Sequence, residues 1–201
     1  ELNVAQELNP DSADIFDRRA QLMWNTGNID GALDNFRQAL NRDPNNSATN
    51  ASLAWLYATV LNDADNAMPL IEKAIQLDSH RPWYHMFRGW ILLSLLDNPQ
   101  EAVEEFTQSI ELYPLGLEYY QNRAIAFNHL ERWEEAIADC TTALQLAPDF
   151  YACLLERAWA YAGNGNKEKA RQDFERYLDE CPEDDCPECH EEARRYLDEN
   201  P

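Results

Sequence analysis

The 201-residue sequence carries 16 Lys and Arg against 37 Asp and Glu, a formal net charge of −21, and 45% of its residues are hydrophobic. Six Trp, nine Tyr and seven Phe add to a hydrophobic share that is ample for a folded core. The acidic surplus makes nucleic acid and anionic membranes poor partners, because proteins bind both mainly through Lys and Arg. We therefore expect a protein or peptide partner that is basic or apolar.

No apolar run approaches the roughly 18 residues that a membrane span needs. The most apolar stretch, residues 90–96, is far too short, so we expect a soluble chain without membrane insertion. The sequence starts at Glu1 and lacks a charged-then-apolar leader, as expected of a shortened chain or of a mature one whose signal was removed. Cytoplasmic and exported locations both fit, and export is favoured if the C-terminal cysteines form disulfides.

A repeat of 34 or 35 residues runs through the chain. In each copy a small residue is followed four positions later by a larger one. The small residues are Ala32, Ala67, Ala102, Ala136 and Ala170, and the larger ones are Phe36, Ile71, Phe106, Cys140 and Phe174. Another small residue precedes each pair by 12 or 13 positions, at Ala20, Ala54, Gly89, Ala124 and Ala158. Small residues let two helix backbones approach closely, so each copy is expected to be a pair of antiparallel helices.

Each copy also ends alike, at Pro44, Ser79, Pro114, Pro148 and Pro182. Together these marks resemble the tetratricopeptide repeat (TPR) family, whose consensus has small residues at two helix crossings, an aromatic on the second helix and a closing Pro. The resemblance covers residues 13–184. It implies an all-α fold, a right-handed superhelical solenoid of antiparallel helix pairs with five TPR units plus terminal half-repeats. Departures are local, such as Cys140 in place of an aromatic residue and Ser79 in place of Pro.

In chain order, residues 1–12 are expected to form a half-repeat that resembles a second helix. Five units follow, at residues 13–46, 47–81, 82–116, 117–150 and 151–184. Residues 185–201 are expected to form one amphipathic helix that caps the last unit. Alternatively, this helix pairs with the N-terminal half-repeat of another copy, which would build a head-to-tail filament outside the cell.

The resemblance implies that the first helices of the units line a concave face. Trp55, Trp90 and Trp159 each follow a crossing residue by one position, which rotates them by about 100° away from the packed face. We therefore predict an aromatic groove that binds a partner, although such a stripe is also typical of a core. The predicted groove residues are Trp24, Trp55, Trp83, Met86, Phe87, Trp90, Gln121, Asn122, Ile125, His129, Leu155 and Trp159. Acidic residues on the same helices, which favour a positively charged ligand, are Asp14, Asp17, Glu118 and Glu156.

One TPR subfamily grips the C-terminal carboxylate of chaperones with Lys, Asn and Arg from three first helices. The corresponding helices here offer Asp17 and Glu156, and only the pair Asn122 and Arg123 is similar to the middle element. Placing a partner's carboxylate beside unpaired acids is unfavourable, so we expect no such clamp.

Four residues near the C-terminus, Cys181, Cys186, Cys189 and His190, have three interpretations besides reduced thiols. We favour a disulfide among the three cysteines that fastens the capping helix to the last unit. Three thiolates and one imidazole also match a zinc site. The run Cys186-Pro-Glu-Cys189-His190 has the spacing of c-type haem attachment. Apart from these two alternatives, we expect no cofactor.

Cys140 and Cys153 are expected to be neighbours, either as two buried thiols or as a disulfide. Asn45 and Asn50 begin glycosylation sequons that matter only in an exported protein. The four His are dispersed and no phosphate-binding Gly-rich loop is present, so we predict no catalytic residues. We expect a non-enzymatic scaffold for protein–protein interaction.

Overall fold

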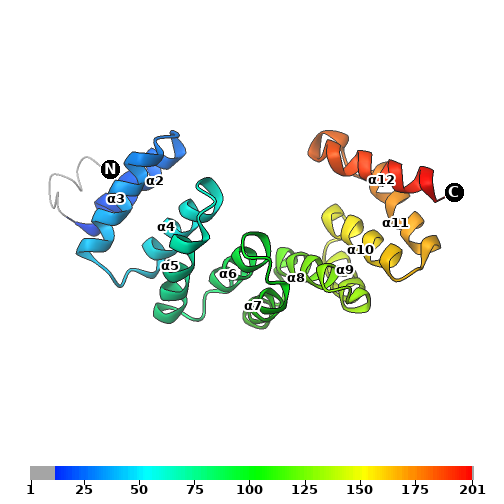
Figure 1. Cartoon of the computed structure of the whole chain (residues 1–201), viewed down its shortest axis with the longest axis horizontal. Coiled ribbons are helices and arrows are strands. Elements are labelled where there is room, and N and C mark those ends of the chain that lie inside the picture. Colours follow the sequence, from blue (N-terminus) through cyan, green and yellow to red (C-terminus); the bar gives the residue numbers. More distant parts are fainter. Residues whose placement is uncertain (1–11, 201) are drawn as a thin grey trace. The chain divides into compact units, whose positions relative to one another are not determined.

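The computed structural model describes residues 12–200 (Figure 1). This part of the chain contains helices and no strand, which confirms the all-α fold. The helices are α2 (Ala13–Asn25), α3 (Ile29–Arg42), α4 (Ser47–Val60), α5 (Ala64–Leu77), α6 (Pro82–Ser94), α7 (Pro99–Leu112), α8 (Leu117–His129), α9 (Trp133–Leu146), α10 (Tyr151–Gly163), α11 (Lys167–Glu180) and α12 (Pro187–Glu199), with a 3₁₀ turn at Glu183–Asp185. Of the half-repeat predicted at 1–12, all but Ser12 lies outside the described residues.

The chain divides into two compact units, Glu1–Leu96 and Asp97–Pro201. In the first unit α2 packs against α3, α4 packs against α5, and α6 contacts both α4 and α5. In the second unit α8 lies between α7 and α9, α10 packs against α8, α9 and α11, and α12 packs against α11. The division falls between α6 and α7, within the unit predicted at 82–116.

Five turns between successive helices share one backbone feature. In each turn one residue has a positive φ angle, and these residues are Gly27, Asn62, Asp97, Glu131 and Gly165. Glycine adopts this left-handed conformation without strain, and Asn and Asp tolerate it better than most residues. Glu131, with φ of 56°, is the least suited of the five. The repeat is therefore visible in the backbone conformation of the turns as well as in the packing of the helices.

The small residues of the repeat lie where helices cross. The crossing positions Ala20, Ala54, Ala124 and Ala158 on first helices are fully buried, as are Ala32, Ala67, Ala102, Ala136 and Ala170 on second helices. Gly89 on α6 is buried as well. The larger residues Phe36, Ile71, Phe106, Cys140 and Phe174 are also fully buried. Close backbone approach at the small residues leaves space that the large side chains fill, which builds the core of each unit.

A buried ion pair ties three helices of the second unit together. Arg123 of α8 donates from Nε and Nη2 to the two carboxylate oxygens of Asp139 on α9, each at 2.7 Å. Its Nη1 donates to Thr107 Oγ1 on α7 at 3.0 Å. Burial raises the pKa of Asp139, and the hydrogen bonds from Arg123 oppose that rise. The bidentate geometry therefore offsets part of the cost of removing the two charges from water.

The same arrangement recurs 34 residues further along the chain. Arg157 of α10 donates to both oxygens of Asp173 on α11 at 2.7 and 2.9 Å, and to Thr141 Oγ1 on α9 at 3.2 Å. The two side chains of this pair are only 16% and 11% exposed. Neither triad was predicted from the sequence.

A different polar contact joins α8 to α10. Asn128 donates from Nδ2 to the backbone oxygen and to Oε2 of Glu156, each at 3.2 Å. Burial raises the pKa of Glu156 to about 7, the bond from Asn128 opposes the rise, and the charge of Glu192 adds to it. Near neutral pH this carboxyl group is therefore divided between its protonated and ionised forms.

Removing one member of the Arg157–Asp173 pair is expected to lower the free energy of unfolding by about 2–4 kcal/mol, because the remaining charge stays buried without a partner. The double variant Arg157→Met, Asp173→Leu is expected to lose much less than the sum of the single variants. Urea unfolding of the four proteins measures the coupling. The exposed pair Arg171–Glu175 is the control, with a coupling below about 0.5 kcal/mol. Additive losses at Arg157 and Asp173 would contradict this account.

The pKa of Glu156 also predicts a pH dependence. Between its ordinary pKa of 4.5 and the folded value of about 7, the folded chain keeps a proton that the unfolded chain releases. Stability from this group is therefore present below 4.5 and is lost as pH rises through about 7. We therefore compare the free energy of unfolding of Glu156→Gln with that of wild type at two pH values. This difference is expected to shift in favour of the variant by about 2 kcal/mol from about pH 5 to about pH 8. Urea unfolding at both pH values measures this gain, with Glu118→Gln as the exposed control. An equal gain in both variants would refute the prediction.

Candidate functional site

Three tryptophan side chains of the first unit surround one buried phenylalanine. The Trp55 ring on α4 lies 4.7 Å from the Phe87 ring on α6 and stacks on Trp90 at 6.3 Å. Trp83 and Trp90 lie 6.3 and 6.1 Å from Phe87 on the same helix. Each of the three indoles is half-buried. We call Trp55, Trp83 and Trp90 the indole cluster.

Phe87 itself is fully buried, so the prediction that it lines the groove is wrong. It lies four residues after Trp83 and three before Trp90, and therefore on the same side of α6. From there its ring reaches the indole of Trp55 on α4. Phe87 thus packs against the buried side of the indole cluster and is not accessible to a partner.

The remaining groove residues of the first unit are half-buried. Trp24 on α2 packs edge-on against Phe36 at 6.5 Å, and Met86 lies on α6. No Trp among these residues is sealed in the core, so part of each indole surface remains accessible.

The second unit contains the other predicted groove residues. Gln121, Asn122 and Ile125 are half-buried on α8, and His129 is exposed at its end. Asn122 donates to the backbone oxygen of Glu118 at 2.7 Å, so its amide is partly used within the helix. A single groove that combines these residues with the indole cluster stays a prediction.

Trp159 on α10 is partly covered by the C-terminal helix. Its ring lies 4.8 Å from Phe174 of α11 and 5.7 Å from Tyr196 of α12, and Phe174 and Tyr196 lie 4.6 Å apart. Because Tyr196 occupies one side of it, Trp159 contributes to holding α12 as well as to any exposed surface.

A cavity of about 360 Å³ lies in the second unit. Its lining combines the predicted groove residues Gln121 and Leu155 with all three C-terminal cysteines. The other lining residues are Phe150, Tyr151, Ala152, Glu156, Tyr177 and Asp185. The wall is therefore apolar and aromatic with two carboxyl groups.

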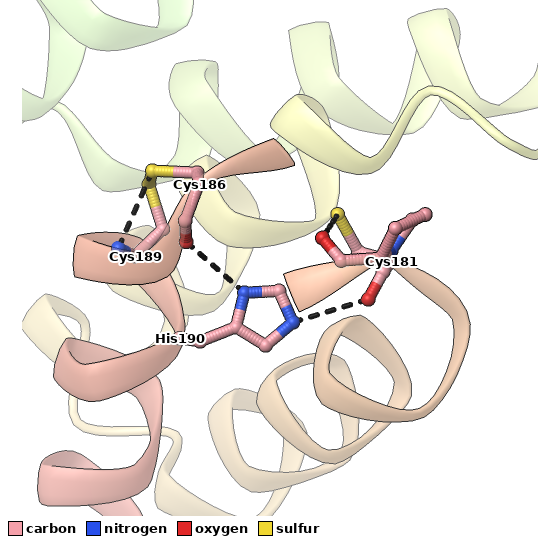
Figure 2. Close-up of a disulfide and its surroundings, with 5 residues drawn as sticks. Cys181, Cys186, Cys189 and His190 are labelled. Atoms are coloured by element: carbon pink, nitrogen blue, oxygen red, sulfur yellow. Dashed lines mark hydrogen bonds between the residues drawn. A yellow bond between two sulfur atoms is a disulfide. The ribbon is translucent and has the colours of Figure 1, made fainter. Parts of the chain in front are cut away.

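Cys186 and Cys189 are joined by a disulfide at the start of α12 (Figure 2). Cys186 is the N-cap residue, and its sulfur accepts a hydrogen bond from the Cys189 backbone N–H at 3.3 Å. Cys181 is a buried free thiol. Both bonded cysteines belong to the first turn of α12, so the expectation that a disulfide fastens this helix to α11 is wrong.

His190 makes the connection that the disulfide was expected to make. Its Nδ1 lies 3.1 Å from the Cys186 carbonyl oxygen and its Nε2 3.1 Å from that of Cys181 (Figure 2). Its ring packs on Tyr177 of α11 at 4.9 Å and is 1% exposed. Each ring nitrogen thus faces a carbonyl oxygen that can accept a hydrogen bond from a ring N–H. The imidazole therefore tethers the start of α12 to the end of α11.

This geometry does not fit zinc or haem, the two alternatives to a disulfide. Both nitrogens of His190 face carbonyl oxygens, and two of the three thiols are bonded to each other, so no zinc or haem ligand set is presented. Among residues 12–200, no group of three or more His, Cys, Asp and Glu is arranged to hold a metal ion. In the same range no helix has the length and apolar character to cross a membrane.

Cys140 and Cys153 are fully buried free thiols. A hydrogen bond with Cys153 and, to a smaller extent, burial raise the pKa of Cys140 well above its ordinary value. The two side chains are thus neighbours within the second unit, as small buried residues and not as a bridge.

The two predicted glycosylation sites differ in access. Asn45 is exposed in the turn before α4, and its modification stays a prediction. Asn50 is 1% exposed, and its amide donates to the backbone oxygens of Pro44 and Asn46 at 3.2 and 2.8 Å. The prediction for Asn50 is wrong, because its amide nitrogen holds the turn and is closed to a glycan.

Two family models, each described as tetratricopeptide repeat, match the chain. One matches residues 123–198 and the other matches residues 18–82 and 88–149. Together they span most of the sequence.

Curated relatives match shorter stretches of longer proteins. The human mitochondrial import receptor subunit TOM70 is 35% identical over 79 residues, which are 37% of this chain and 13% of that protein. The DnaJ homolog subfamily C member 7 homolog of Schizosaccharomyces pombe is 26% identical over 156 residues, 69% of this chain and 32% of that protein. The chain thus spans no more than about a third of either relative.

Solved structures show the same fold at low identity. MamA superposes with a TM-score of 0.77 at 20% identity, covering 85% of this chain and 92% of that one. YrrB, described as a TPR protein with an unusual peptide-binding site, has a TM-score of 0.75 at 20% identity and covers 90% and 92%. These structures support the fold alone, whereas the family models also match the sequence, and on that basis the chain belongs to the tetratricopeptide repeat family.

Proposed function

We propose that this chain is a non-catalytic interaction scaffold that binds a peptide or protein segment through the indole cluster. The observation that carries the proposal is the half-burial of Trp55, Trp83 and Trp90 around the fully buried Phe87. Contact with Phe87 and the Trp55–Trp90 stack holds the rings in place before a partner arrives. Fixed aromatic surface gives large contact area at a small cost in side-chain entropy, as at protein–protein hot spots.

The charge of the chain favours a basic or apolar partner. With a net charge of −21, the surface repels acidic segments and attracts basic ones at long range. On α2 in the first unit, Asp14 is exposed, while Asp17 accepts hydrogen bonds from Thr49 and Gln21. The peptide-binding site named for YrrB supports a peptide as the class of ligand.

Head-to-tail assembly is the alternative that the terminal half-repeats suggested. It requires residues 1–12, nearly all of which lie outside the described part of the chain. In addition, Tyr196 of α12 packs on Trp159 and Phe174 of its own chain, so this side of the helix is already covered. We therefore favour the scaffold.

Replacing an indole is expected to weaken binding without unfolding the chain. A displayed library of random peptides is selected for binding to the purified chain. The affinity of an enriched peptide is then measured by fluorescence polarisation. We expect enriched peptides to carry net positive charge, and expect Trp55→Ala and Trp90→Ala each to lower affinity at least about tenfold.

Tyr113→Ala is the matched control, since Tyr113 is an exposed aromatic residue outside the predicted groove. Circular dichroism and the thermal midpoint establish that each variant is folded. If both folded Trp variants bind the peptide as tightly as wild type does, the indole cluster is not the binding surface.

A further inference from the structure

The Cys186–Cys189 disulfide is placed where another polypeptide can reach it. Both cysteines are half-buried and line the cavity of about 360 Å³ in the second unit. The bond connects positions three residues apart within one helical turn. By contrast, Cys140 and Cys153 are fully buried in the core.

This disulfide is expected to contribute little to the stability of the fold. It closes a loop of four residues, and the loop-closure entropy available to a disulfide is smallest for the shortest loops. The attachment of α12 comes instead from His190 hydrogen bonds to Cys181 and Cys186, and from Tyr196 packing on Phe174. Reduction of the bond would leave these contacts in place.

The start of α12 favours a reactive thiolate at Cys186 once the bond opens. Its sulfur occupies the N-cap position and lies 3.3 Å from the Cys189 backbone N–H. An anion at this position is stabilised by the amide and by the positive end of the helix dipole. Cys-x-x-Cys pairs at helix N-termini owe their reactivity to this stabilisation, because the thiolate is the form that exchanges.

We propose that Cys186 and Cys189 form an exchange-active pair that accepts two electrons from a cysteine pair of a polypeptide bound in the adjoining cavity. A partner thiolate attacks the Cys186 sulfur, the Cys186–Cys189 bond breaks, and Cys189 leaves as a thiolate that takes a proton from water. The second partner thiol loses its proton and attacks the partner sulfur of the mixed disulfide. This releases Cys186 and leaves the partner with a disulfide. Two thiols are oxidised and one disulfide is reduced, and a partner disulfide drives the reverse reaction.

The cavity wall indicates the chemistry of the partner. Phe150, Tyr151 and Leu155 offer apolar surface, and Glu156 and Asp185 supply carboxyl groups. The segment that fits has a cysteine pair flanked by apolar and basic residues. This inference is independent of the indole cluster, which belongs to the other unit.

The test uses a synthetic peptide in which two cysteines are flanked by Leu and Lys, and a matched peptide with Glu in place of Lys. The reduced peptides are mixed with the oxidised chain, quenched with acid, alkylated and mapped by mass spectrometry. We expect the Lys peptide to reduce the Cys186–Cys189 bond at least about tenfold faster than the Glu peptide does. The Lys peptide is also expected to reduce this bond faster in the folded chain than in an isolated peptide of residues 183–192 that holds the same disulfide.

Trapping identifies the reacting sulfur. With the oxidised Lys peptide, Cys189→Ser is expected to accumulate a one-to-one adduct through Cys186, about tenfold faster than Cys186→Ser does through Cys189. Trp55→Ala, which changes a residue of the other unit, is expected to exchange like wild type, and this separates the proposal from the scaffold. The proposal is overturned if the bond in the folded chain reacts no faster than in the isolated peptide, or if the two trapping variants react equally.

Discussion

Close contact between helices at small residues is the constraint on which the rest of the structure depends. Ala54 and Ala158 are fully buried, and Gly89 is buried on α6, so each first helix can adopt only the rotation that turns its small residue toward its neighbours. A residue one position later is then carried about 100° around the helix. Trp55, Trp90 and Trp159 occupy that position and are half-buried. The rotation that builds the core therefore also determines which indoles reach the surface.

Much of this arrangement could be predicted because it is local and periodic. The spacing of small residues predicts the helix pairs, and the one-residue offset predicts that Trp55 and Trp90 turn away from the packed face. The same reasoning failed for Phe87, because its burial depends on which neighbour faces that side of α6, and spacing within one helix does not specify this. The Arg123 and Arg157 triads were missed although their members recur 34 residues apart, since a charged residue on a helix is more often solvated than paired.

The C-terminal region shows the limit of reasoning from residue types. Three cysteines within nine residues allow three pairings, and the sequence does not choose among them. The structure bonds Cys186 to Cys189 and assigns the tethering of α12 to His190. The cavity beside this bond draws its wall from α8, α10, α11 and the start of α12, and residues so distant in sequence are brought together only by the packing of repeats. The chain thus combines a regular repeat with a C-terminal end of different chemistry.

The central claim is that the indole cluster meets a partner directly. The nitrogen-bound protons of the six tryptophan rings give separate signals in a ¹H–¹⁵N NMR spectrum, so titration with a selected basic peptide reports on each ring. The account predicts that the signals of Trp55, Trp83 and Trp90 shift together on one binding curve, while that of Trp133 on α9 stays in place. Saturable binding that leaves the three cluster signals unmoved would contradict it.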